Sequence, residues 1–265
     1  MTKKQTSLRE MSLTTAKAVS HSMTSKPSLY ALQFAYEGQS FAQNFSTLQR
    51  LLNEVPANSI ALAPELCLSA YSYDAMEEAA CFSEEIFPQL KALSKNKAFG
   101  LTLIEKREQG YVNNFNFFHN GEKVYTQAKS KLFPLGDEQS HFIPGNSEDI
   151  RIFSINGIKI AVLICFELRF TTLWEQIKGS DLILIPAYWG KLRKKHFETL
   201  TEAIAITNQA YVLCANGADE SMAHSSGIIT PFGEALRDDT CELITSRLDF
   251  QEIKKMRRYL TIGLD

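Results

Sequence analysis

"KIAVLICFELRF", residues 159–170, is the stretch on which the interpretation of the whole chain depends. It runs through mostly apolar residues to Cys165 and then turns charged at Glu167 and Arg169. A short apolar run that ends this abruptly is typical of a buried strand. Cys165 then has two interpretations: a small buried hydrophobe, which is the commoner role of a free cysteine, or a nucleophile held at the strand's end. Glu167 and Arg169 are expected to brace the turn rather than to react.

Segments with strand and helix patterns alternate on both sides of this stretch. Strands are predicted at residues 29–36, 59–65, 98–106, 111–120, 123–131, 181–187 and 210–216. Helices are predicted across the apolar repeat at 41–52 and at residues 86–96, 171–178 and 194–208. The Asn-Gly pairs at 120–121 and 156–157 favour tight hairpin turns. This alternation predicts one α/β domain, residues 29–265, with two packed sheets flanked by helices, after a polar tail at 1–28 that we expect to be mobile.

The composition is that of a globular protein whose expected partners are small molecules or proteins. Hydrophobic residues make up 45% of the 265 residues, which is enough for a substantial core. A formal net charge of -2 gives no reason to expect a nucleic acid or an anionic membrane as a partner. The short basic runs at residues 191–196 and 254–258 are interpreted as solvated helix faces.

Cysteine usage and the lack of targeting signals predict a cytoplasmic protein. The 5 cysteines are odd in number, and no two have the spacing of a zinc or redox motif, which favours a reducing compartment. No apolar run approaches the roughly 18 to 20 residues that cross a bilayer, and residues 1–28 lack the apolar block of a secretory signal. The sequence shows neither clustered metal ligands nor a glycine-rich phosphate loop, so we expect no metal and no cofactor.

Reactive residue types recur where predicted strands end. Glu65 closes the strand "SIALAPE", Lys129 lies within "YTQAKSKLFP", and Cys165 closes "KIAVLIC". Sheets of α/β proteins bind ligands at the carboxyl ends of their strands. Each residue also has a structural interpretation, Glu65 as a helix-start carboxylate and Lys129 as a lysine on an exposed strand face. Taken together, they favour a catalytic site.

With these contexts the chain resembles the nitrilase superfamily, the carbon-nitrogen hydrolases, from about Leu29 to about Arg237. "LAPELCLSAY", "YTQAKSKLFP" and "LICFELRF" are similar to the family's three catalytic segments, which implies the catalytic residues Glu65, Lys129 and Cys165. "GDEQSHFIPGN" resembles a loop with a further glutamate, here Glu138. The resemblance, closest to the amidase branch, implies a four-layer αββα sandwich of two mixed sheets flanked by helices, and a homodimer or higher homo-oligomer.

Amide hydrolysis explains why these residue types belong together. A thiol is mostly protonated at neutral pH, so a base such as Glu65 is needed to make the Cys165 thiolate near the substrate. A fixed cation, Lys129, and the backbone N–H of Phe166 would stabilise the oxyanion that forms as the thiolate adds. Glu138 would orient Lys129 or the leaving amide. Four further residues are expected to flank the pocket: Tyr71, Tyr188, Trp189 and His196.

The expected function is hydrolysis of a small amide to ammonia and a carboxylate through a thioester, in the manner of an ω-amidase. Two enzyme alternatives remain, an N-carbamoyl amino acid amidohydrolase similar to β-ureidopropionase and a nitrilase, because the same three residues serve both. A third alternative is a catalytically inactive binding subunit. The departures from the family pattern bear on it: Lys131 in place of a histidine, Thr171 and Thr172 in place of Pro-Glu, Glu202, Ile204 and Thr207 in place of arginines and an acidic residue, and His224 in place of a glycine.

Overall fold

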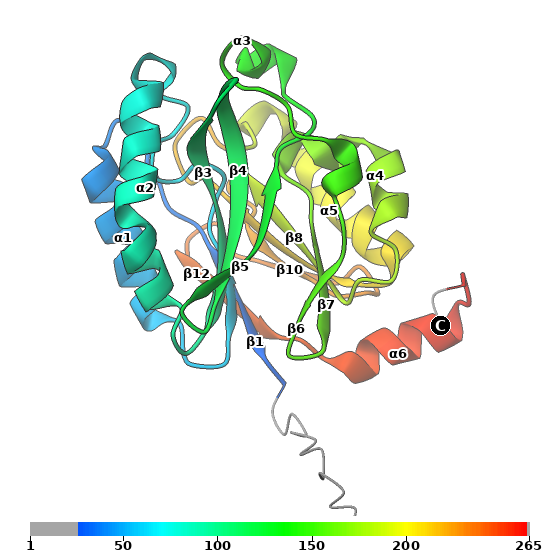
Figure 1. Cartoon of the computed structure of the whole chain (residues 1–265). Coiled ribbons are helices and arrows are strands. Elements are labelled where there is room, and N and C mark those ends of the chain that lie inside the picture. The colour runs from blue at the N-terminus through cyan, green and yellow to red at the C-terminus, as the bar shows by residue number, and fades with distance from the viewer. Residues whose placement is uncertain (1–25, 264–265) are drawn as a thin grey trace, which may run out of the picture.

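Two six-stranded sheets form the centre of the protein (Figure 1). The computed structural model describes residues 26–263, so most of the predicted tail, up to residue 25, lies outside the described residues. The first sheet has the strand order β12 (Leu243–Arg247), β1 (Ser28–Leu32), β2 (Ile60–Leu62), β3 (Ala98–Arg107), β4 (Gly110–His119), β5 (Glu122–Ala128). The second has the order β11 (Ala235–Arg237), β10 (Gly227–Ile229), β9 (Tyr211–Asn216), β8 (Leu182–Ala187), β7 (Ile158–Val162), β6 (Phe153–Ile155).

Both sheets are mixed, as the sequence predicts. In the first sheet β1, β2 and β3 are parallel, and β3, β4 and β5 are antiparallel. In the second, β7, β8 and β9 are parallel, while β6 and β10 pair antiparallel at either side. The predicted Asn-Gly turns are present: Asn120 and Gly121 have φ values of 52° and 82°, and Asn156 and Gly157 have 48° and 81°. Two successive positive φ values are the geometry of a type I′ hairpin turn.

Helices cover the outer faces of the sheets and complete the four layers (Figure 1). The helices are α1 (Phe41–Glu54), α2 (Met76–Leu93), α3 (Glu138–His141), α4 (Thr171–Gln176), α5 (Lys194–Asn208) and α6 (Phe250–Tyr259). α1 and α2 lie on the first sheet, where Leu48, Leu90 and Leu101 belong to one buried cluster. The larger cluster includes Leu62 of the first sheet and Val162 of the second, and it extends to Trp174 of α4 and Phe197 of α5. The predicted αββα sandwich is therefore confirmed.

The start of α1 shows how local sequence sets an element's boundary. Ser40 Oγ accepts a hydrogen bond from Gln43 N, and the Gln43 side chain accepts one from Ser40 N. This capping box satisfies two N–H groups that a helix start would otherwise leave unpaired. α2 is the one helix that the sequence placed wrongly, because it begins at Met76 and not near residue 86. In its first turns, Met76 and Ala79 belong to the same buried cluster as Leu66. The apolar pattern at residues 86–96 does not indicate this earlier part of the helix.

Several strands end earlier than their apolar patterns do, and this shift positions the site. The predicted strand 59–65 ends at Leu62, and the predicted strand 123–131 ends at Ala128. Glu65 N instead donates to Ala187 O at the end of β8, so the segment after β2 crosses to the other sheet. Both Glu65 and Lys129 thus stand just beyond their strands. Among residues 26–263, no helix is long and apolar enough to cross a membrane.

Candidate active site

A buried lysine between two carboxylates is the centre of the site. Lys129 Nζ donates to Glu65 Oε1 at 2.7 Å and to Glu138 Oε1 at 2.6 Å. The side chains of Lys129 and Glu65 are 0% exposed and that of Glu138 is 3% exposed. Tyr71 joins them, since its hydroxyl donates to Glu138 Oε1 at 3.0 Å and lies 3.4 Å from Lys129 Nζ. Buried charges are stable only when they are paired in this way.

Backbone and side-chain hydrogen bonds fix Glu65 from several directions. Tyr36 donates its hydroxyl to Glu65 O at 2.7 Å, and Asn113 donates its amide to Glu65 Oε1 at 2.9 Å. The next residue, Leu66, has a left-handed φ of 46°, and its N–H donates to the Thr102 hydroxyl. The second carboxylate oxygen, Glu65 Oε2, is buried and has no hydrogen-bond partner among the described residues. One oxygen is therefore occupied by Lys129 and Asn113, and the other is available for a proton.

The segment after β5 holds Lys129 and Glu138 together. Lys129 N donates to Asn113 O, and Gly145 N donates to Lys129 O, both at 2.8 Å. Gly145 approaches so closely that a β-carbon on it would stand 2.4 Å from Ala128 O. Glu138 is fixed by a hydrogen bond from Phe133 N to its Oε2 at 3.1 Å. Gly145, which follows Pro144, is therefore needed for the loop that carries Glu138 to pack against Ala128.

Cys165 lies at a strained turn between β7 and the short 3-10 segment Cys165–Arg169. Its φ is 44°, a conformation that costs a non-glycine residue about 1 to 3 kcal/mol and that is common at functional sites. Glu167 braces this turn, as predicted: its Oε2 accepts from Ile164 N at 2.7 Å, and its Oε1 accepts from Ser130 N at 2.6 Å. Because Ser130 follows Lys129, the same carboxylate ties the cysteine turn to the lysine segment. The Phe166 N–H lies in the first turn of the segment, where helical N–H groups have no intrahelical partner.

The charges of the cluster determine which groups hold protons. Burial and then the Glu65 carboxylate raise the pKa of Cys165, and Lys129 only partly opposes them, so the resting group is a thiol. Burial alone would lower the pKa of Lys129, but Glu65 and Glu138 outweigh it and raise that pKa, so the ammonium stays charged. Burial also raises the pKa of Glu138 against the opposing effect of Lys129. Thiolate formation therefore needs a nearby base.

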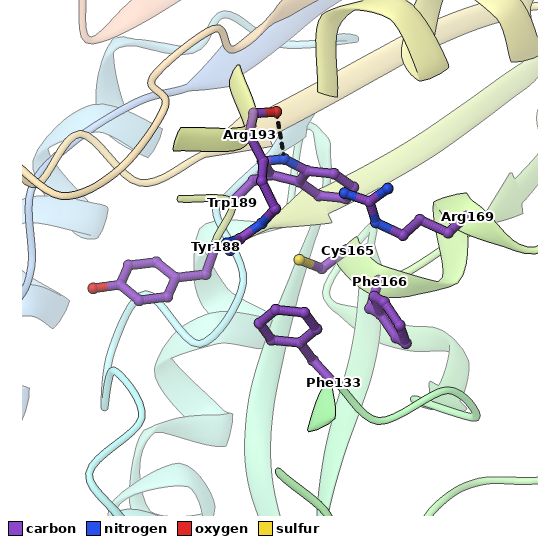
Figure 2. A pocket seen from close by; sticks show the side chains of 7 residues that line it. All are labelled: Phe133, Cys165, Phe166, Arg169, Tyr188, Trp189 and Arg193. Carbon is purple, nitrogen blue, oxygen red and sulfur yellow. Dashed lines mark hydrogen bonds between the residues drawn. The ribbon is translucent and has the colours of Figure 1, made fainter. Parts of the chain in front are cut away.

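A small pocket opens beside the Cys165 sulfur (Figure 2). It encloses about 230 Å³ of empty space, part of it open to solvent, and its lining is Phe133, Cys165, Phe166, Arg169, Tyr188, Trp189 and Arg193. The Arg169 guanidinium lies over the Trp189 ring at 4.7 Å from its centroid, and that of Arg193 lies over Phe133 at 5.1 Å. Within residues 26–263, neither arginine forms a salt bridge with a carboxylate. The pocket thus presents two cations beside a cysteine.

The structure differs from the sequence interpretation in the outer parts of the site. Tyr188, Trp189 and Phe166 line the pocket, whereas Tyr71 faces the lysine cluster. His196 does not line the pocket but contacts Arg169. Both arginines were missed. Arg169 was expected only to brace the turn, and the solvated helix face predicted for 191–196 was wrong at its third residue, where the chain makes the 3-10 turn Lys191–Arg193 before α5.

Comparisons with known proteins identify a matching family, related sequences and a similar fold. The model of the family described as "Carbon-nitrogen hydrolase" matches residues 31–258. The omega-amidase YafV of Escherichia coli is 29% identical over 199 residues, which cover 73% of this chain and 77% of the relative. A 2-oxoglutaramate amidase of Bacillus subtilis is 28% identical over 172 residues, 62% of this chain and 65% of the relative. In fold, the chain is similar to a CN-hydrolase superfamily protein of Xanthomonas campestris, with a TM-score of 0.80 and 19% identity over 89% of this chain and 95% of the other.

Proposed function

This chain belongs to the carbon-nitrogen hydrolase family, and we propose that it hydrolyses the carboxamide of a small carboxylic acid in the manner of an ω-amidase. Cys165 is the nucleophile, Glu65 the general base and acid, and Lys129 the cation that stabilises the oxyanion. The observation that carries this proposal is the Glu65–Lys129–Glu138 cluster beside the Cys165 thiol, at a pocket lined by two arginines.

In the first half of the reaction the amide is exchanged for a thioester. Glu65 takes the thiol proton of Cys165 through its unpaired Oε2, and the sulfur forms a bond to the amide carbon. Negative charge moves to the carbonyl oxygen, where Lys129 and the Phe166 N–H would receive it; one such donor is worth about 3 to 4 kcal/mol. Glu65 then returns the proton to the departing nitrogen as the carbon-nitrogen bond breaks, and ammonia leaves.

The second half uses the same groups on water. Glu65, again unprotonated, removes a proton from a water molecule that adds to the thioester carbon. The tetrahedral intermediate collapses, the carbon-sulfur bond breaks, and the thiol regains its proton while the carboxylic acid leaves. Glu138 supports both halves because it shares the charge of Lys129, leaving Glu65 more basic than it would be with the lysine as its sole partner.

The pocket favours a small anionic substrate. It is small, with about 230 Å³ of empty space that includes open solvent. Within the described part of the chain, Arg169 and Arg193 are the only charged residues that line it, and guanidinium groups suit a carboxylate. Among the described residues, no carboxylate lines this pocket to receive an α-ammonium group. A monoamide of a dicarboxylic acid therefore fits better than the amide of an amino acid, in line with the names of the relatives.

The experiment is an ammonia assay on the purified protein with four substrates: succinamate, neutral butyramide, N-carbamoyl-β-alanine and butyronitrile. We expect the highest kcat/KM for succinamate. Cys165→Ala should lose all turnover, and Cys241→Ala, which removes an exposed cysteine, should keep it. Preference for the carbamoyl compound or the nitrile would support the corresponding alternative activity. No turnover of any compound, with Cys165 no more reactive toward iodoacetamide than the other cysteines, would support the inactive subunit.

We also propose that residues 29–265 form one cytoplasmic domain that works as a homodimer or higher homo-oligomer. All five cysteines are free, which suits a reducing compartment. Exposed apolar side chains line one groove at the ends of α5 and α6, namely Ile206, Tyr259, Leu260 and Ile262. A patch of this kind favours contact with another protein chain. Light scattering after size exclusion should give at least twice the mass of one chain, and Tyr259→Asp should reduce it if this groove is the contact.

A further inference from the structure

His196 contacts one of the two pocket arginines from outside the pocket. Its Nδ1 lies 3.2 Å from Arg169 Nη2, and the ring stands on the exposed side of α5. A guanidinium can only donate hydrogen bonds, so Nδ1 must be the unprotonated ring nitrogen that accepts this one. Among residues 26–263, no carboxylate forms a salt bridge with His196. The imidazole is therefore the hydrogen-bond partner of the Arg169 guanidinium.

The face on which Arg169 rests is itself held rigidly. Trp189 is 3% exposed. Its backbone N–H donates to Asn216 Oδ1 at 2.6 Å, and its indole Nε1 donates to Arg193 O at 2.8 Å. Arg169 lies over this indole, with His196 at the end of its guanidinium. The indole contacts one side of the guanidinium, and the imidazole accepts a hydrogen bond from its Nη2. An arginine held this way loses less rotamer entropy when it binds an anion.

We propose that His196 is a positioning residue that holds Arg169 toward the pocket, so that the arginine binds the carboxylate of the substrate. This inference rests on the proposed function, because it assigns the anionic end of the amide to Arg169. It also gives two residues of the basic run 191–196 a role, Arg193 in the pocket lining and His196 behind Arg169. Since the carboxylate is bound equally before and during the reaction, His196 should affect KM and leave kcat nearly unchanged.

Two variants separate positioning from general packing. His196→Ala removes the acceptor, and His196→Asn places an amide oxygen near the position of Nδ1. We expect His196→Ala to raise the KM for succinamate about tenfold, the effect of losing one hydrogen bond to a charged group. Its kcat for succinamate and its kcat/KM for butyramide should match the wild type. His196→Asn should restore the low KM, and His119→Ala, which changes a histidine at the far end of β4, should have no effect.

The Kd of succinate, measured by calorimetry, tests the inference without turnover. His196→Ala should weaken succinate binding about tenfold, and His196→Asn should restore it. An unchanged Kd and KM in His196→Ala would overturn the inference, and so would an equal loss for succinamate and butyramide. If the wild type hydrolyses no amide but its succinate binding depends on His196, the proposed function fails while the positioning role stands.

Discussion

Replacing Lys129 by methionine tests whether the buried charges are as tightly linked as their geometry suggests. Methionine keeps most of the volume but leaves Glu65 and Glu138 without the cation that lies 2.7 and 2.6 Å from them. Removing one partner of a buried ion pair costs about 3 to 5 kcal/mol. The variant can avoid part of this cost by protonating one of the two carboxyls. For a carboxyl with an unfolded pKa of about 4.3, protonation costs about 4.4 kcal/mol at pH 7.5 and about 1 kcal/mol at pH 5.

The sign of the pH dependence follows from the same change. In Lys129→Met the folded-state pKa of a remaining carboxyl rises above its unfolded value. The stability this group contributes is then present at low pH and lost as the pH rises. We therefore expect the free energy of unfolding of the variant to fall short of the wild type by about 4 kcal/mol at pH 7.5 and about 1 kcal/mol at pH 5. Urea denaturation followed by tryptophan fluorescence at both pH values measures this. Adding Glu138→Gln to the variant should recover most of the loss at pH 7.5.

Lys97→Met is the matched control. Lys97 is partly buried, and its side chain donates to the backbone oxygens of Leu52 and Val55, at the end of α1. Its loss removes two hydrogen bonds without leaving a carboxylate unpaired, so it should cost about 1 to 3 kcal/mol with little difference between the two pH values. If Lys129→Met showed the same loss at pH 5 as at pH 7.5, the carboxylates would not depend on the lysine, and the charge argument would be refuted.

Three further predictions concern the surroundings of the cluster. Gly145→Ala should lower the free energy of unfolding by at least about 2 kcal/mol in urea denaturation, because its β-carbon would stand 2.4 Å from Ala128 O; wild-type stability would show that the loop yields easily. Glu65→Gln should lower the pKa of Cys165, since Glu65 raises it, so alkylation by iodoacetamide should begin at lower pH while amide turnover falls about 10²- to 10⁴-fold. An alkylation profile that stays in place or moves to higher pH would contradict this. Raising NaCl from about 0.05 to about 0.5 M should lower kcat/KM about threefold for succinamate and leave butyramide unchanged, if the two pocket arginines attract the anion; equal effects on both amides would count against that attraction.

The residues of the proposed reactive centre could be selected from the sequence because each of them follows a strongly patterned strand. Glu65, Lys129 and Cys165 come within three residues of the ends of β2, β5 and β7. Apolar runs of this kind indicate where a sheet edge lies, and the edge brings their ends together. The patterns continued past the hydrogen-bonded strands because residues there stay buried after the chain has left the sheet. Burial determines the apolar pattern, whereas the end of a strand is determined by the carbonyl group to which each backbone N–H donates.

The arginines of the pocket could not be found in this way. Arg169 and Arg193 follow different elements, and a surface arginine and a pocket arginine have the same local pattern. What distinguishes them is an aromatic face supplied by another segment, Trp189 for the first and Phe133 for the second. Such contacts join residues 20 to 60 positions apart, and no periodicity in one sequence encodes them. The sequence therefore indicated the reaction more clearly than the substrate.

The departures from the family pattern lie outside the pocket, and Glu202 and Ile204 among them belong to α5. Ile204 is fully buried, and Glu202 lies 3.6 Å from Arg237 of β11. Arg237 also donates to the hydroxyl of Thr201 and to Ser225 O, so a cation from β11 supplies positive charge beside the helix face where many family members carry arginines. His224 adopts a φ of 55°, which explains why a glycine is usual there. Since none of these residues lines the pocket, they give no reason to infer a lost activity, and they leave the inactive-subunit alternative without structural support.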